Sequence, residues 1–404
     1  MTKASMTFNR ILKLTLGRYL KSRFNTVFTD INGVNGLKPP YIILANHTNF
    51  WDPFIISMFI KEPVYFVTSD EYFRNWMMRL LLKLVGGIPK TKFVSDTATV
   101  NSIIKVIKHY KGIVGIYPEG RRNWDGRTLQ ILYPTAKLVK AFNIPVVAAL
   151  SKGACLSFPR WASKPRKGRL EVELRIIADK DEITSMPVQD LYERICASLM
   201  HDEYDFQSGA MIPYKGKLLA EHIELFLFTC PSCRSIGRIK SYNDTIKCLE
   251  CGYSSKYNQF GYLEEVPPVS SNPGAGIVFS NPHDWDVWQA DHLRNLITQS
   301  ASDESKPVFE DSNVLLRIGA RLIPLKDFRI GRLALFNKRI EFTTLLGERF
   351  DFPFSRITGV NVQYNNQFEF YFEKKLYRFI FRIGVVSAYK WVKAFEISEN
   401  KAGG

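Results

Sequence analysis

The sequence lacks several features by which a protein is often assigned to a class. None of its 404 residues lies in an uninterrupted apolar stretch of the roughly 18 residues that a membrane-spanning helix needs. Cysteine is scarce, with six residues in the chain, which argues against a disulfide scaffold. The chain has neither a G-x-S-x-G nor a phosphate-loop pattern, and these two absences argue against hydrolytic and nucleotide-driven chemistry.

Acidic residues are fewer than basic ones. The 39 aspartates and glutamates are outnumbered by 55 lysines and arginines, which gives a formal net charge of +16. Such a balance favours an anionic partner, such as nucleic acid, an anionic membrane face or a phosphorylated substrate. The densest basic stretch, residues 164–169 with Arg160 before it, is typical of a solvated loop or of a contact with lipid headgroups.

The N-terminal residues 1–30 are rich in basic side chains and contain no acid before Asp30. Residues 7–28 place apolar side chains at roughly helical spacing, so residues 1–30 are predicted to form an amphipathic helix suited to an anionic membrane surface. The pattern leaves open a surface helix packed on its own domain. Because basic residues interrupt any signal-peptide core, we expect a peripheral protein on the cytoplasmic face of the membrane, without a transmembrane helix.

The rest of the chain divides into four segments by its pattern. Residues 31–210 alternate short apolar runs with helical stretches, which predicts an α/β domain with a mixed, mostly parallel sheet and flanking helices. Residues 222–265 hold two cysteine pairs, and residues 266–306 are predicted to form a linker and a helix. Residues 307–400 predict a β-rich α+β module that loosely resembles PH or GRAM-like domains.

A first polar cluster, NHTNFWD, places His47 and Asp52 five positions apart. Histidine is a natural general base near neutral pH, and a carboxylate can fix its tautomer and stabilise the imidazolium. Because residues five positions apart on one helix point about 140° apart, the pair can meet only if His47 precedes a helix and Asp52 lies in its first turn. Pro53 fits such a helix start. A capping aspartate beside an unrelated histidine would give the same pattern.

A second polar cluster, YPEGRRN, contains Glu119, Gly120, Arg121 and Arg122 after an apolar run. We expect these residues at the carboxyl end of a strand, where α/β sheets usually bind ligands. Arginine suits phosphate because its planar donors bind two oxygens at once. A solvated turn is the alternative.

Together these clusters resemble the glycerolipid acyltransferases, including the 1-acylglycerol-3-phosphate acyltransferases, whose signatures are an H-x4-D block and an F-P-E-G-T-R-S block. The segments GGIPKTK (86–92) and NIPVVAAL (143–150) resemble two weaker blocks in the same order, and the resemblance covers roughly residues 30–200. Lys92 stands where an arginine is usual and Arg121 replaces the usual threonine, so the head group of the acceptor stays open.

The resemblance implies a role for each matching residue. His47 would remove the proton from an acceptor hydroxyl that attacks an acyl thioester, Asp52 would orient His47, and no covalent acyl-enzyme would form. The residues implied to hold the lysophospholipid and its acyl partner are Lys92, Glu119, Gly120, Arg122 and Pro145. The implied donor is acyl-CoA or acyl-carrier protein, and the implied acceptor is 1-acylglycerol 3-phosphate.

Four cysteines form two C-x-x-C pairs with fourteen residues between them: Cys230, Cys233, Cys248 and Cys251. Four thiolates at this spacing predict a structural zinc site of the zinc-ribbon type, with no open coordination position. Free thiols or a redox pair are the alternatives. Zinc ribbons also bind nucleic acids or proteins, but the pattern favours a stabilising role first.

The sequence thus predicts a membrane-associated acyltransferase of phospholipid biosynthesis with an appended zinc ribbon. Two alternatives stay open: the same chemistry on a different lipid acceptor, and a zinc-ribbon adaptor with an inactive acyltransferase domain. Intact His47, Asp52 and Arg122 favour the enzyme, and nucleic acid is not the expected partner.

Overall fold

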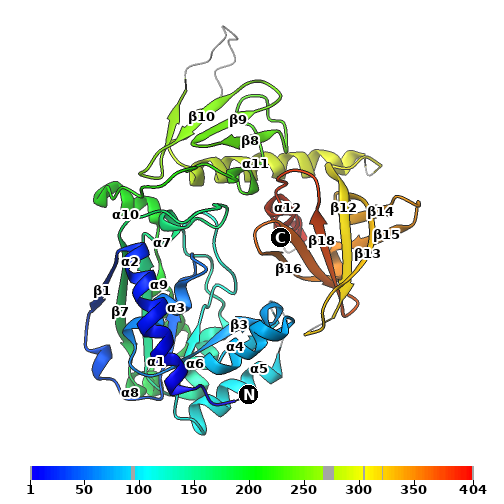
Figure 1. Cartoon of the computed structure of the whole chain (residues 1–404). Helices are drawn as coiled ribbons and strands as arrows, with labels where there is room; N and C mark the ends of the chain where they lie inside the picture. The colour runs from blue at the N-terminus through cyan, green and yellow to red at the C-terminus, as the bar shows by residue number, and fades with distance from the viewer. Residues whose placement is uncertain (1, 92–95, 267–276, 304, 321, 403–404) are drawn as a thin grey trace. The chain divides into compact units, whose positions relative to one another are not determined.

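The computed structural model describes residues 2–91, 96–266, 277–303, 305–320 and 322–402 (Figure 1). The chain divides into two compact units, which are Met1–Arg160 with Lys164–Gly216 and Trp161–Ser163 with Lys217–Gly404. Most of the predicted linker, residues 267–276, lies outside the described residues. In the described part of the chain, none of the helices has the length and apolarity that a membrane crossing requires.

A seven-stranded sheet forms the centre of the first unit. Its strand order is β1-β7-β6-β2-β5-β3-β4, and all neighbouring strands are parallel except β6 and β7. The strands are β1 (Thr26–Asp30), β2 (Ile42–Ala45), β3 (Val64–Ser69), β4 (Ile88–Lys90), β5 (Ile113–Ile116), β6 (Val146–Lys152) and β7 (Leu170–Ala178). The predicted α/β fold with a mixed, mostly parallel sheet is confirmed.

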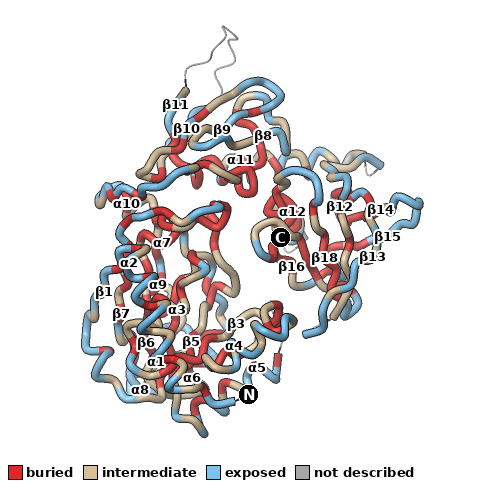
Figure 2. Tube along the Cα trace, in the orientation of Figure 1, coloured by how far each residue is buried: buried red, intermediate tan, exposed pale blue. Residues whose placement is uncertain are grey.

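Helices cover both faces of this sheet. They are α1 (Met6–Leu12), α2 (Arg18–Phe24), α3 (Asp52–Phe59), α4 (Trp76–Val85), α5 (Thr97–Lys108), α6 (Pro134–Phe142), α7 (Ala154–Ser157), α8 (Lys180–Ser185), α9 (Val188–Leu199) and α10 (Glu203–Ala210). Ile43 of β2 packs with residues of α2 and α3, whereas its neighbour Ile42 packs with residues of α6 and α9. Because both faces are covered, β2 is buried along its whole length, and Figure 2 shows buried trace around β5 and β6 at the centre of the same sheet.

The N-terminal helical segment has two different faces. Leu20 and Phe24 are buried in the core of the first unit, whereas Ile11 and Leu14 are exposed. A π-helical turn (Lys13–Gly17) joins α1 to α2, and β1 follows directly after α2. The segment therefore packs on its own domain and still presents apolar side chains to solvent.

The second unit contains two antiparallel sheets and two helices. The small sheet has the order β11-β10-β9-β8, with β8 (Ile239–Tyr242), β9 (Thr245–Cys248), β10 (Ser254–Tyr257) and β11 (Leu263–Glu265). The large sheet has the order β15-β14-β13-β12-β18-β17-β16. Its strands are β12 (Phe309–Gly319), β13 (Lys326–Leu335), β14 (Arg339–Thr344), β15 (Arg349–Pro353), β16 (Ile357–Gln363), β17 (Gln367–Phe372) and β18 (Lys375–Phe381). This sheet is the β-rich module predicted from the sequence.

Two helices join the sheets of the second unit, α11 (Pro282–Gln299) and α12 (Tyr389–Ala402). The side chain of Gln289 in α11 accepts from the backbone amides of Phe228 and Thr229, close to the first cysteine pair. Asp286 in α11 accepts a hydrogen bond from the hydroxyl of Tyr389 in α12. The three segments delimited from the sequence after residue 222 therefore pack as one unit, and their boundaries stay predictions.

We expect Phe24→Ala to lower the free energy of unfolding by about 3–5 kcal/mol, because it removes a fully buried ring that joins α2 to the sheet. Tyr19→Ala truncates an exposed ring on the same helix and should change it by less than about 0.5 kcal/mol. Urea unfolding followed by circular dichroism measures both variants. Equal losses in the two would contradict this account of the N-terminal segment.

Candidate functional site

His47 and Asp52 meet in the loop between β2 and α3. Nδ1 of His47 lies 3.0 Å from Oδ2 of Asp52, and the same oxygen accepts the backbone amides of Thr48 and Asn49. α3 begins at Asp52, with Pro53 next, so the helix starts where the spacing requires it. Asp52 is only 1% exposed, whereas His47 is part-exposed. A hydrogen bond between Nδ1 and a carboxyl oxygen favours the imidazole tautomer whose lone pair is on Nε2.

Three backbone contacts hold this loop against the rest of the sheet. The side chain of Asn46 exchanges two hydrogen bonds with the backbone of Ser151 in β6, at 2.9 and 2.8 Å. The side-chain amide of Asn49 donates to the carbonyl of Ala154, at 3.3 Å. The backbone amide of Asn123 donates to the carbonyl of His47 at 3.0 Å, which joins the two polar clusters. The position of the His47 loop is therefore set by neighbouring strands and loops.

Glu119 supports the same loop from the second cluster. One carboxylate oxygen accepts the backbone amide of His47 at 2.6 Å, and the other accepts the amide of Leu129 at 2.8 Å. The side chain is 3% exposed, and burial together with the charge of Asp52 raises its pKa to about 8, against the opposing effect of these hydrogen bonds. Glu119 is thus a positioning residue for His47 here, and its contact with an acceptor stays a prediction.

Two further residues of the second cluster shape the site. Gly120 has a φ of 73°, a left-handed conformation that suits glycine, and its amide donates to the carbonyl of Tyr117 at 3.0 Å. The guanidinium of Arg122 has a pKa lowered by burial, while the nearby Tyr72 and Asp52 act in the opposite direction. Arg122 therefore lies within electrostatic range of Asp52 and Tyr72.

Other predicted residues lie elsewhere. Pro145 precedes β6 and its carbonyl accepts the amide of Ile42, at the amino end of β2, whereas His47 follows the carboxyl end of that strand. The structure does not bring Pro145 to the His47 loop. Lys92 lies outside the described residues.

The sequence did not predict the contacts of several residues near His47 and the second cluster. The ring of Tyr117 stacks on the His47 imidazole, with centroids 4.0 Å apart, and burial raises the pKa of this tyrosine. Arg160 is buried, donates to the carbonyl of Arg122 at 2.8 Å and lies over the ring of Trp124. Asn46 directly precedes His47, and a polar residue at the end of a buried strand is a signal that could have identified it.

The prediction of a solvated loop or a headgroup contact for residues 164–169 with Arg160 is partly wrong. Arg160 and Arg166 are both buried, so they belong to neither a solvated loop nor a headgroup contact. Arg160 instead holds the backbone of the second cluster, as described above.

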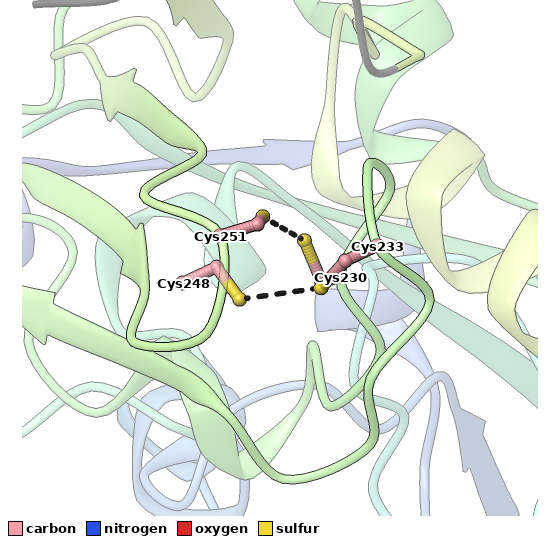
Figure 3. A group of neighbouring side chains, drawn as sticks. All are labelled: Cys230, Cys233, Cys248 and Cys251. Atoms are coloured by element: carbon pink, nitrogen blue, oxygen red, sulfur yellow. Dashed lines mark hydrogen bonds between the residues drawn. The ribbon is translucent and has the colours of Figure 1, made fainter. Parts of the chain in front are cut away.

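The four cysteines of the second unit form a compact group (Figure 3). Their sulfurs lie within 4.8 Å of one another, with Cys230 and Cys251 at 3.6 Å and Cys233 and Cys248 at 3.7 Å. Zn–S bonds of about 2.3 Å in a tetrahedral site separate neighbouring sulfurs by about 3.8 Å, whereas a disulfide joins them at about 2.05 Å. The group therefore fits a single metal ion held by four thiolates.

Comparison with known proteins identifies the class of the first unit. Residues 23–152 match the family model described as Acyltransferase, and this span contains His47, Asp52, Glu119 and Arg122. The chain therefore carries an acyltransferase-family domain, and the enzyme is an acyltransferase.

One solved structure similar to the chain is the 1-acyl-sn-glycerophosphate (LPA) acyltransferase PlsC from Thermotoga maritima. The sequence identity is 17% and the TM-score is 0.40, over 48% of this chain and 76% of that chain. No curated protein matches the sequence.

The raised pKa of Glu119 predicts a pH dependence of stability. A carboxyl group that stays neutral in the fold stabilises it fully below the unfolded pKa, and this contribution is lost as the pH rises through the folded pKa. We expect the free energy of unfolding to fall between about pH 4.5 and about pH 8, and Glu119→Gln to remove this part of the slope. Urea titrations at several pH values measure the slope, and identical slopes in both proteins would contradict the assignment.

For the cysteine group, we expect protein purified without chelators to contain a stoichiometric amount of zinc. Cys230→Ser should lose the metal and lower the thermal midpoint by several degrees, because binding free energy of a structural ion is folding free energy. The matched control is Cys196→Ser, a cysteine outside the group, which should keep the metal. Metal analysis that finds no zinc in the wild-type protein would count against the ribbon.

Proposed function

We propose that the protein is a lysophospholipid acyltransferase that moves an acyl chain from acyl-CoA or acyl-carrier protein to the free hydroxyl of 1-acylglycerol 3-phosphate. The observation that carries the proposal is the His47–Asp52 pair, with Nδ1 3.0 Å from Oδ2, inside an acyltransferase-family domain. A buried carboxylate that orients a part-exposed histidine is the arrangement that general-base catalysis requires.

In the proposed reaction, Nε2 of His47 takes the proton from the acceptor hydroxyl while that oxygen attacks the thioester carbonyl. The tetrahedral intermediate then expels the thiolate, which receives the proton from the imidazolium. An ester and a free thiol leave, and His47 is neutral again. Asp52 stabilises the imidazolium in between, and Glu119 keeps the loop of His47 in place.

No covalent acyl-enzyme is proposed. A thioester is already activated, so a positioned base and a correctly oriented acceptor can suffice. The nearby thiol of Cys155 is buried, and burial raises its pKa well above the ordinary value, so it is poorly suited to act as a nucleophile.

The proposed phosphate-binding residues are Arg122 and Lys92. Arg122 interacts electrostatically with Asp52 and carries planar donors that suit a phosphate monoester. Lys92 would add a point charge without a bidentate fork. Because Arg121 replaces a threonine that is usual in the resembling family, a different lipid acceptor is the main alternative within the same chemistry.

We also propose a peripheral position on the cytoplasmic face of an anionic membrane. The exposed Ile11 and Leu14 lie among the basic residues of the N-terminal segment, which has no acid before Asp30. An apolar face combined with positive charge is typical of helices that lie in the membrane interface.

The cysteine group is proposed to hold a structural zinc ion, and nucleic acid is not proposed as a partner. Two basic residues near the group are already engaged within the second unit. Arg238 pairs with Glu250 at 3.2 Å, and the ammonium of Lys240 donates to the carbonyl of Val385 at 3.0 Å. These contacts favour a stabilising role over a binding face for phosphates.

The direct test is acyl transfer by the purified protein, with labelled acyl-CoA or acyl-carrier protein offered to several lysolipids. We expect transfer to 1-acylglycerol 3-phosphate, and His47→Ala should reduce its rate by about 10²–10⁴-fold because the general base is removed. The control is His109→Ala, which changes an exposed histidine at the carboxyl end of α5 and should keep the rate.

The outcomes separate the alternatives. Transfer to another lysolipid alone would keep the mechanism and change the acceptor. Full turnover by His47→Ala would remove His47 from the mechanism. Absence of transfer with every donor and acceptor, together with salt-sensitive binding of nucleic acid, would favour the adaptor.

A further inference from the structure

The helix α4 presents an apolar face to solvent. Trp76 is 77% exposed and Leu80 is 54% exposed, and Met77 and Leu81 are exposed as well. No residue of α4 is buried, and Figure 2 shows its trace without buried segments. An isolated exposed leucine is ordinary, but several large apolar side chains side by side mark an interaction surface.

Helical geometry places these side chains on one face. At about 100° per residue, Trp76, Leu80 and Leu84 follow one another along the helix, and Met77 and Leu81 lie beside them. A surface helix of a globular protein normally turns such a stripe towards its core. In α4, by contrast, Trp76, Met77, Leu80 and Leu81 form an apolar stripe that stays exposed.

α4 lies between the candidate active site and the N-terminal helices. It follows the 3-10 turn Asp70–Phe73, in which the ring of Tyr72 lies 6.2 Å from that of Phe50 in the His47 loop. At its other end, the carbonyl of Leu84 accepts the backbone amide of Ser5, at the start of α1. One face of the chain thus runs from the His47 loop along α4 to α1.

The charge around α4 is of one sign. α4 itself carries two basic residues, Arg79 and Lys83, and no acid. The two acids just before this helix, Asp70 and Glu71, are buried and pair with Arg74. Such a helix complements a negatively charged surface, and an apolar face with an exposed tryptophan is suited to the boundary between headgroups and acyl chains.

We propose that α4 inserts its apolar face into the interface of an anionic phospholipid bilayer, close to the His47 loop. This inference rests on the proposed function, and it explains how an acceptor with long acyl chains reaches His47 without leaving the membrane. Trp76 and Leu80 supply the inserted side chains, and Arg79 and Lys83 of the same helix supply attraction to the lipid headgroups.

The test is co-sedimentation of the full-length protein with vesicles of phosphatidylcholine containing phosphatidylglycerol, and with vesicles of phosphatidylcholine alone. The double variant Trp76→Gln with Leu80→Gln should weaken the partition into the anionic vesicles by about tenfold or more. The matched control is Val100→Gln with Met200→Gln, two exposed apolar residues of the same unit outside α4, which should bind as the wild type does. Circular dichroism verifies that each variant is folded.

The rate of acyl transfer is a second measurement, and it separates an effect on membrane binding from an effect on the catalytic step. The α4 variant should keep its rate on a short-chain, water-soluble lysolipid and lose rate on the same head group in vesicles. Unchanged vesicle binding by the α4 variant would overturn the proposal, and so would a wild-type dimer that the variant converts to a monomer while it still binds vesicles. If no acceptor is acylated but binding depends on α4, the membrane contact is supported and the proposed function fails.

Discussion

The candidate active site depends on one buried oxygen atom, Oδ2 of Asp52. This atom accepts from Nδ1 of His47 and from the amides of Thr48 and Asn49, so it sets the shape of the loop and the tautomer of the base at once. Burial of a carboxylate is costly, and hydrogen bonds to its charged form offset that cost. Glu119 holds the same loop from the other side, which leaves the backbone of His47 little freedom to move.

The sequence predicted the parts of this site that local pattern encodes. Hydrophobic periodicity was sufficient for the α/β fold, and the five-residue spacing of His47 and Asp52 was sufficient for a loop followed by a helix start. The stacking of Tyr117 on His47 joins residues seventy positions apart and leaves no mark in a local pattern. For the same reason, Arg160 was read with its basic neighbours in sequence, although in the fold it holds Arg122.

The resemblance to a family predicted which residues are present better than it predicted where those residues lie in the fold. Glu119 matches the motif, but both of its oxygens are taken up by backbone amides in this fold. Pro145 also matches a family block, and it lies at the other end of the strand layer from His47. A motif specifies which side chains are present. The partners of each side chain depend on the order of the strands in the sheet, and the motif does not encode that order.

Composition predicted separate segments in what the structure shows to be one unit. Polar side chains join these segments in the fold. Gln289 is fully buried in α11 and binds the amides of Phe228 and Thr229, and the latter residue directly precedes Cys230. Asp286, one turn earlier, continues the contact to α12 through Tyr389. A glutamine and an aspartate on a helix usually indicate a solvated face, so composition cannot reveal this connection.

Gln289 accepts the backbone amides of Phe228 and Thr229, and these hydrogen bonds couple the stability of α11 to the segment that leads into Cys230. A cysteine group that lost its ion would loosen the chain to which α11 is tied, and through α11 the β-rich sheet. Proteases act on segments that open together, so a chain made under metal shortage would be cut throughout the second unit and not at the ribbon alone. The abundance of the protein would then follow the supply of the metal that we propose for this group.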